Sequence, residues 1–176
     1  MTDKDGIRPR RKPTHMQSFD YSENHKYFVT ICSDDKRMMF SRIIVGEGLA
    51  PPVTRLSKIG HIIENNITAL DKRYCSLTVE KYVIMPNHIH MILQLDNTEE
   101  ASLNSGGASP SHTLHDVVCA LKSLVTRDCR QTGCKEKIWQ RSYYEHIIRN
   151  ETDYKNIWLY IDNNPAKWSE DKYYCI

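Results

Sequence analysis

The sequence predicts an α+β plait, in which helices cover one face of an antiparallel sheet. Elements alternate along the 176 residues in the order strand, helix, two strands, helix, extended segment and helix. No internal repeat interrupts this order, and the length suits one domain with a single core. We therefore expect residues 1–176 to form a single domain.

The first half predicts an arm, two strands and a helix. Residues 1–20 are an irregular basic arm, and residues 26–32 form a strand because they are rich in β-branched and aromatic side chains. Residues 38–45 supply a short strand before the turn cluster at 46–52. Residues 55–71 form an amphipathic helix. Its apolar positions recur at helical spacing: Leu56, Ile59, Ile62, Ile63, Ile67 and Leu70.

The middle of the chain predicts two strands in close succession, at residues 76–85 and 88–95. Residues 97–112 are polar and rich in glycine and serine, which is typical of a flexible loop. We expect this segment to be an insertion, and we assign it no role.

The last third predicts two helices around an extended segment. Thr113 caps a helix whose apolar positions are Leu114, Val117, Val118, Leu121, Leu124 and Val125. Residues 138–148 are mixed and partly extended. Asn150 and Asp153 resemble an N-cap pair that opens a final helix, and Pro165 closes it.

Composition excludes several classes of protein. A hydrophobic content of 40% and a charged content of 26% are typical of a globular protein. The sequence contains no run of eighteen apolar residues, so we expect no membrane span. The N-terminus lacks the apolar stretch of a signal peptide. The six cysteines contain no CxxC pair, so we expect free thiols in an intracellular protein rather than a zinc knuckle.

The distribution of charge says more than the net charge of +2. Arg8, Arg10, Arg11 and Lys12 form a basic cluster without an acid. Residues 113–150 hold seven basic and four acidic side chains, interleaved with Trp139, Tyr143 and Tyr144. Such patterns favour nucleic acids, because cations neutralise phosphates and aromatic rings stack on exposed bases. A basic tail and a solvated face would explain the same charges.

Two histidines on one predicted strand form a candidate metal site. Side chains alternate along a strand, so His88 and His90 point to the same face while Ile89, Met91 and Leu93 point to the other. Neutral imidazoles at this spacing can converge on one divalent ion. Alternatively, they are a pair of surface or half-buried histidines without a ligand.

The final helix brings a tyrosine and an amide together. Its core stripe consists of Tyr154, Ile157, Trp158 and Ile161. Tyr160 and Asn164 are four residues apart and lie together beside this stripe. The two histidines and Asn164 could hold an ion that polarises a phosphodiester, while Tyr160 supplies the attacking oxygen. Alternatively, Tyr160 is an aromatic side chain packed beside Trp158.

Three ordered blocks resemble one known family. They are Met85–His90 (MPNHIH), Trp139–Asn150 (WQRSYYEHIIRN) and Tyr160–Pro165 (YIDNNP). Together they resemble the REP-associated tyrosine transposases, which belong to the wider one-tyrosine HUH transposase superfamily. The resemblance also includes the basic start and residues 27–32, so it covers nearly the whole chain.

The resemblance implies the HUH endonuclease fold, a ferredoxin-like plait, and an enzyme that cuts and joins single-stranded DNA beside palindromic hairpins. His88 and His90 match the paired metal ligands, Tyr160 matches the nucleophile, and Asn164 matches the amide-bearing third ligand. The implied cofactor is Mg²⁺ or Mn²⁺. The implied setting is the cytoplasm of a prokaryote, near the nucleoid, as a monomer or a homodimer without a membrane.

The basic arm, Arg141 and Arg149 are our candidate DNA-binding residues. We expect Tyr143, Tyr144 and His146 to pack or to contact DNA rather than to catalyse. Two alternatives stay open: a protein of the same fold that binds hairpin DNA without cutting it, and a zinc hydrolase in which water attacks.

Overall fold

An antiparallel sheet of four strands organises the chain. The computed structural model describes residues 25–45, 52–96 and 112–174. The strand order across the sheet is β4 (Leu77–Ile84), β5 (His88–Leu95), β1 (His25–Cys32) and β6 (Tyr144–Ile148). The predicted arm at residues 1–20 lies outside the described residues, as does the predicted loop at 97–112 except for its last residue.

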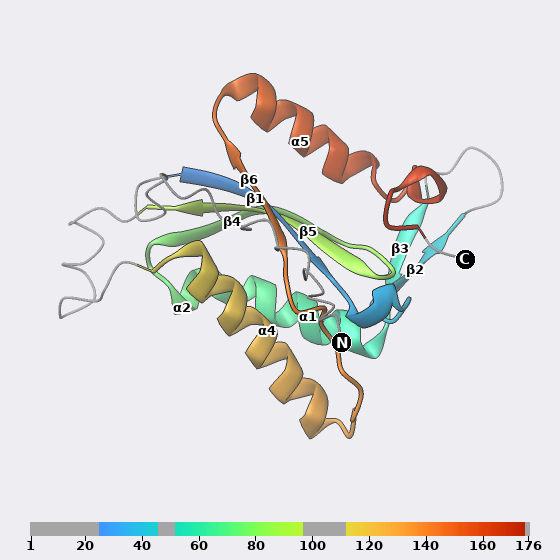
Figure 1. Cartoon of the computed structure of the whole chain (residues 1–176). Coiled ribbons are helices and arrows are strands. Elements are labelled where there is room, and N and C mark those ends of the chain that lie inside the picture. Colours follow the sequence, from blue (N-terminus) through green and yellow to red (C-terminus); the bar gives the residue numbers. More distant parts are fainter. Residues whose placement is uncertain (1–24, 46–51, 97–111, 175–176) are drawn as a thin grey trace, which may run out of the picture.

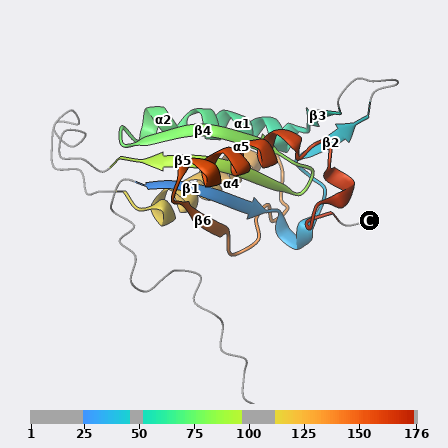
Figure 2. The same cartoon turned by 90° about the horizontal axis from the view of Figure 1, so that it is seen from above.

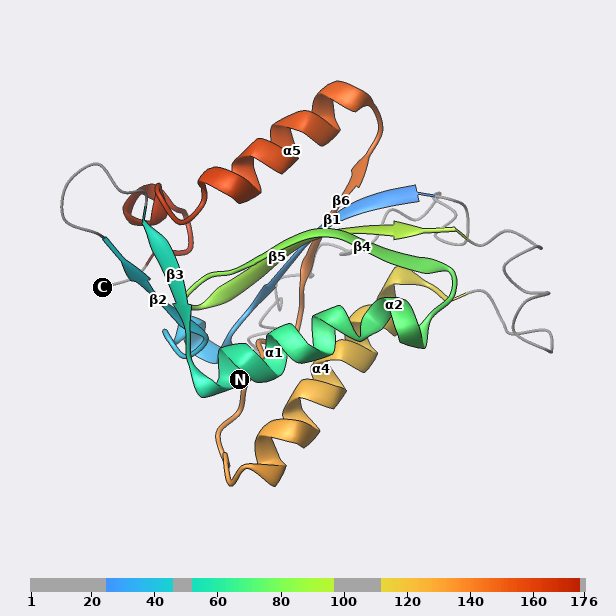
Figure 3. The same ribbon diagram turned by 180° about the vertical axis from the view of Figure 1, so that it is seen from behind.

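Helices pack on both faces of this sheet (Figures 1 and 3). The helices α1 (Lys58–Thr68), α2 (Leu70–Arg73) and α4 (Leu114–Gln131) cover one face, and α5 (Glu151–Asn163) crosses the other. The predicted α+β class with an antiparallel sheet is therefore confirmed. The prediction placed all helices on one face, whereas α5 packs on the opposite face.

The strands place a different set of side chains on each face. The larger core lies between the sheet and α1, α2 and α4. It includes Tyr27, Val29, Ile31, Ile89, Met91, Leu93, Val117 and Leu121. On the other face, the predicted stripe of α5 packs against Phe28 and Ile92. Because side chains alternate, His88 and His90 share this second face with Ile92.

The N-terminal part of the fold differs from the prediction at one point. The strand β2 (Ser41–Ile44) pairs with an unpredicted strand, β3 (Val53–Leu56), in a separate hairpin (Figure 2). The helix predicted from residue 55 therefore starts later, at Lys58. Its N-cap is Ser57, whose hydroxyl accepts a hydrogen bond from the Gly60 amide at 3.0 Å.

The caps of the two later helices agree with the prediction. Thr113 forms a capping box with Asp116 at the start of α4. The Asn150 side chain accepts a hydrogen bond from the Asp153 amide at the start of α5. The predicted final helix ends at Asn163, with Asn164 as its C-cap. A short 3-10 helix, η1 (Asp34–Lys36), follows β1, and another, η2 (Trp168–Glu170), follows α5.

Two predictions from composition can be compared with the structure. Within the described ranges, no helix has both the length and the apolar character that crossing a membrane requires. Five of the six cysteines are described, and all five are free thiols.

Candidate active site

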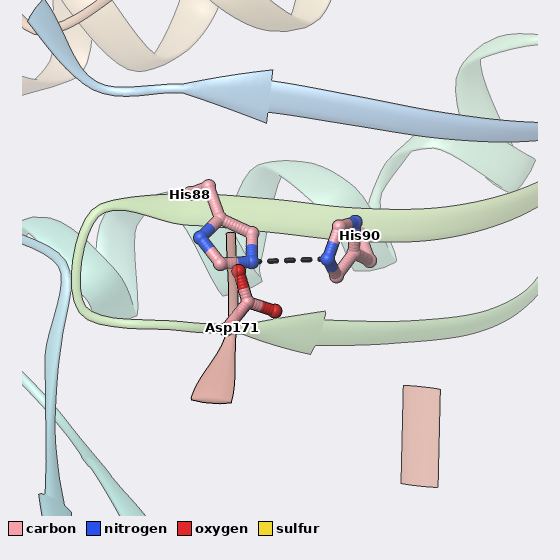
Figure 4. Close-up of side chains that lie close together, drawn as sticks. All are labelled: His88, His90 and Asp171. Carbon is pink, nitrogen blue, oxygen red and sulfur yellow. Dashed lines mark hydrogen bonds between the residues drawn. The ribbon is translucent and has the colours of Figure 1, made fainter. Parts of the chain in front are cut away.

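The strand β5 carries both predicted histidines into a buried position. Its pairing with β1 sets His90 opposite Thr30 and His88 opposite Cys32. Both imidazoles are almost fully buried, and their Nε2 atoms lie 3.0 Å apart (Figure 4). They are therefore not the surface or half-buried histidines of the alternative interpretation.

Neighbouring side chains hold the second nitrogen of each ring. The Asn87 amide nitrogen donates to the backbone carbonyls of Lys36 and Tyr173, at 3.1 and 2.8 Å. This leaves its Oδ1, 2.9 Å from His88 Nδ1, to accept the imidazole proton. On the other ring, Thr30 Oγ1 lies 2.8 Å from His90 Nδ1. Such contacts orient metal-binding histidines and set their tautomers.

This pattern fits a cation between the rings. With its proton on Nδ1, neutral His88 turns the lone pair of Nε2 toward His90. Without an ion, His90 can satisfy that lone pair only by carrying its own proton on Nε2. A cation would take the place of this proton, and Thr30 would then accept a hydrogen bond from His90 Nδ1.

The helix α5 brings Tyr160 and Asn164 to the same place. The Tyr160 hydroxyl lies 3.3 Å from His90 Nε2. Its ring packs edge-on against Phe28, with 6.0 Å between ring centres, whereas Trp158 packs against Tyr154. Tyr160 is 39% exposed, while Asn164 is buried. Tyr160 is therefore not the packing partner of Trp158 that the alternative interpretation required.

Asp171 completes the cluster, and the sequence did not point to it. Its Oδ2 accepts hydrogen bonds from the Tyr160 hydroxyl at 3.1 Å and from Asn164 Nδ2 at 2.9 Å. One ligand atom each from Asp171, His88 and His90 lies within 4.8 Å of the others (Figure 4). No periodicity marks Asp171, because it follows η2 in an irregular segment.

The donor atoms suit a divalent metal. Imidazole nitrogen and carboxylate oxygen are common ligands of transition metals, and carboxylate and amide oxygen also suit Mg²⁺ and Mn²⁺. Asn164 Oδ1 is buried and has no hydrogen-bond partner among the described residues. A buried acceptor of this kind is normally satisfied, so it supports Asn164 as a ligand beside the two histidines.

Burial controls the protonation of the cluster. It lowers the pKa of His88 to about 4, against a smaller opposite effect of the Asp171 carboxylate. Burial, with a smaller contribution from His88, also lowers the pKa of His90 well below its ordinary value. Burial and then the Asp171 charge raise the pKa of Tyr160. At neutral pH both histidines are therefore neutral, as metal binding requires, and the phenol keeps its proton.

A groove of about 510 Å³ opens beside Tyr160, between α5 and β6. Phe28 of β1 and the segment 170–172 also line it. Within the family-like block at 139–150, Tyr144 and His146 line this groove. Trp139 is buried, and Tyr143 packs against the larger core. Of the three interleaved aromatic residues, only Tyr144 is half exposed and able to stack on a base.

Of the predicted DNA-binding residues, only Arg141 and Arg149 are described, and neither belongs to this cluster. Arg8, Arg10, Arg11 and Lys12 lie outside the described residues, so their role stays a prediction. Arg141 and Arg149 are exposed on either side of β6.

Known proteins resemble this chain over different lengths. No family model matches the chain. An uncharacterized protein of Haemophilus influenzae is 30% identical over 178 residues, which is 96% of this chain and 95% of the relative. A second protein of that organism, named "Putative REP-associated tyrosine transposase", is 31% identical over 94 residues, which is 48% of this chain and 47% of the relative.

A solved structure has the same fold. It is a REP-associated tyrosine transposase bound to a REP hairpin, with a TM-score of 0.59 and 20% identity over 90% of this chain and 76% of the other. The chain thus has the fold of a transposase. The similarity to REP-associated tyrosine transposases thus consists of this shared fold and of the partial sequence match.

Proposed function

We propose that this protein is a metal-dependent single-stranded DNA endonuclease and strand transferase that acts at hairpin-forming palindromic DNA. One observation carries the proposal. The Tyr160 hydroxyl lies 3.3 Å from His90 Nε2 in a buried histidine pair, yet the tyrosine itself is 39% exposed beside a groove. A phenol placed between a candidate metal site and solvent can reach a phosphodiester.

The reaction is a transesterification. The Tyr160 oxygen attacks the phosphorus and the bond to the 3′-oxygen breaks. This leaves a tyrosine–5′-phosphate link and a 3′-hydroxyl. Asp171 Oδ2, 3.1 Å from the phenol, is placed to take its proton, and the leaving 3′-oxygen takes up a proton in return. Another 3′-hydroxyl reverses the step and joins a new strand.

His88, His90 and Asn164, together with Asp171, would hold a Mg²⁺ or Mn²⁺ ion. Such an ion would polarise the scissile phosphate and offset charge that develops on it. The lowered pKa values of the histidines keep their lone pairs available near neutral pH. Asn87 and Thr30 fix the orientation of the rings.

The proposed substrate is a single strand that carries a hairpin, because a related transposase structure contains a REP hairpin. The first experiment incubates the protein and Mn²⁺ with hairpin-forming oligonucleotides from the DNA that flanks its gene. A denaturing gel should show a covalent protein–DNA band. A protein that binds hairpins without cutting them would shift the DNA on a native gel only. A zinc hydrolase would release cut DNA without an adduct.

Tyr160→Phe should abolish the covalent band and leave hairpin binding within a few fold. The substitution removes only the phenolic oxygen, and the ring can still pack on Phe28. Tyr154→Phe is a matched control on the same helix, and it should keep the adduct. An adduct that survives in Tyr160→Phe would assign the nucleophile to another residue.

His88→Ala and His90→Ala should each remove metal-dependent cleavage. Each should also weaken Mn²⁺ binding in calorimetry by more than the roughly 10- to 100-fold that the loss of an outer-shell partner costs, since each loses a direct ligand. EDTA should stop the wild-type reaction. His61→Ala, an exposed histidine of α1, is the control and should change neither quantity. Unchanged Mn²⁺ affinity in both site variants would refute the proposed site.

A further inference from the structure

We propose that the groove beside Tyr160 binds one unpaired base of the DNA strand, with Tyr144 as its stacking platform and His146 as a group that contacts the base edge. This inference rests on the proposed function and names the part of the substrate that lies next to the scissile phosphate. The groove volume of about 510 Å³ falls within the range of about 300–1,000 Å³ that is typical of sites for small organic groups.

The charges in the groove favour a base over a phosphate. Asp153, Glu170 and Asp171 line it together with a single lysine, Lys172. Asp171 belongs to the proposed metal site, so the carboxylates left to the groove are Asp153 and Glu170. They would repel a phosphate, whereas they can accept hydrogen bonds from the amino groups of a base. The half-exposed aromatic ring of Tyr144 offers a face to a base that has left its stack. Only an unpaired base can enter such a groove in this way.

Tyr144 has the position and exposure that stacking needs. The strand β6 alternates, so Tyr143 packs toward the larger core while Tyr144, opposite Thr30, faces the α5 side. The Tyr144 side chain is 50% exposed, so α5 does not cover it. Lys172 Nζ lies over one face of the ring, 5.3 Å from its centre, so the base would stack on the other face.

His146 is held in a defined orientation at the same groove. Its Nε2 lies 2.8 Å from Asp153 Oδ2, so Nε2 carries a proton that it donates to the carboxylate. The Asp153 carboxylate also accepts from the Arg149 amide at 3.4 Å, which ties it to the start of α5. Among the described residues, none forms a hydrogen bond with Nδ1 of His146. This nitrogen is thus available to a base edge, and Asp153 acts as a positioning residue.

The binding of the base can be measured without catalysis. Tyr160→Phe protein is mixed with hairpin oligonucleotides that carry 2-aminopurine at each position around the mapped cleavage site. One position should show strong fluorescence quenching by stacking. Adding Tyr144→Ala should remove this quenching, and Tyr144→Phe should keep it. Equal fluorescence at every position, or quenching that persists in Tyr144→Ala, would refute the subsite.

Cleavage supplies an independent test. Tyr144→Ala should raise the KM for adduct formation roughly 5- to 100-fold, the range expected for one base–aromatic stack, while Tyr144→Phe stays within about 2-fold. An abasic site at the quenched position should cause a similar loss, and the two changes together should not add. His146→Ala should reduce the preference among the four bases at that position.

The outcomes separate this proposal from the proposed function. If wild-type protein forms no adduct, the transesterification fails. If an adduct forms but Tyr144→Ala and the abasic site leave its KM unchanged, the base subsite alone fails. Additive effects of the two changes would also overturn the subsite, because they would show that Tyr144 and the base do not meet.

Discussion

The buried imidazoles of His88 and His90 make the folded protein sensitive to acid. Both have a lowered pKa, and that of His88 is about 4, whereas an unfolded histidine titrates near 6.5. Between these values the unfolded chain binds more protons than the folded chain. Stability is therefore complete above about pH 6.5 and falls as the pH decreases toward 4.

We expect the metal-free protein to lose up to about 3 kcal/mol of unfolding free energy from His88 alone between pH 7 and pH 4. Urea denaturation at a series of pH values measures this loss. His88→Gln with His90→Gln should flatten the slope between pH 5 and 6.5. NMR titration of the wild-type imidazoles is the direct check. Imidazole pKa values near 6.5 would contradict the prediction.

Residues differ in how far the sequence predicts their role. His88 and His90 follow from strand alternation, and Tyr160 and Asn164 follow from the four-residue spacing of a helix. Asp171 and Thr30 could not be predicted in this way. Thr30 reaches His90 through the register between β1 and β5, and the turn after α5 brings Asp171 close to His88 and His90. Both are contacts between segments far apart in the chain, which no local pattern records.

At the scale of the elements, the first turn of α1 lies unusually close to the backbone of Phe40. A Cβ atom on Gly60 would lie only 2.1 Å from the backbone oxygen of Phe40. That oxygen also accepts a hydrogen bond from the Ser57 amide at 2.9 Å. The same backbone oxygen therefore contacts the N-cap residue of α1 and lies close to Gly60. Glycine at this helical position is therefore required by packing, although alanine has the higher helix propensity.

Gly60→Ala should destabilise the protein by about 1–3 kcal/mol, because the backbone must move to admit the methyl group. A Gly→Ala change without a clash would instead stabilise a helix by roughly 0.5–1 kcal/mol. Asn65→Ala, at an exposed position of the same helix, is the matched control and should be neutral or slightly stabilising. Urea midpoints measure both effects. Stabilisation by Gly60→Ala would show that the helix start can shift freely.

Long periodic elements were predicted better than short ones. The core stripe of α5 and the cap of α4 are confirmed because their signals lie within a few residues. The strand β3 was missed because Val53–Leu56 has only four residues and is stabilised by pairing with β2. The second helical layer was also missed. An apolar stripe predicts that a helix packs, but not on which face of a sheet it packs.

On the scale of the whole molecule, the two faces of the sheet have different tasks. The face toward α1, α2 and α4 holds the larger apolar core, while the face toward α5 combines a small apolar cluster with the candidate active site. Near this site, carboxylates outnumber lysines in the groove lining. We therefore expect a large part of the affinity for the DNA backbone to come from cations elsewhere in the chain.

The basic cluster Arg8, Arg10, Arg11 and Lys12 is the first candidate for these cations, although it lies outside the described residues. Each phosphate contact to a single strand adds about 0.7 to the slope of log affinity against log salt. Replacing all four residues with alanine should therefore lower the slope by up to about 3 and weaken binding at low salt. The adduct rate at saturating DNA should change little, because the proposed transesterification uses none of these four side chains. Fluorescence anisotropy across a salt series measures the slope, and truncation of residues 1–12 provides a second variant. An unchanged slope in both variants would place the phosphate contacts in residues 113–150, where Arg141 and Arg149 would be the next substitutions.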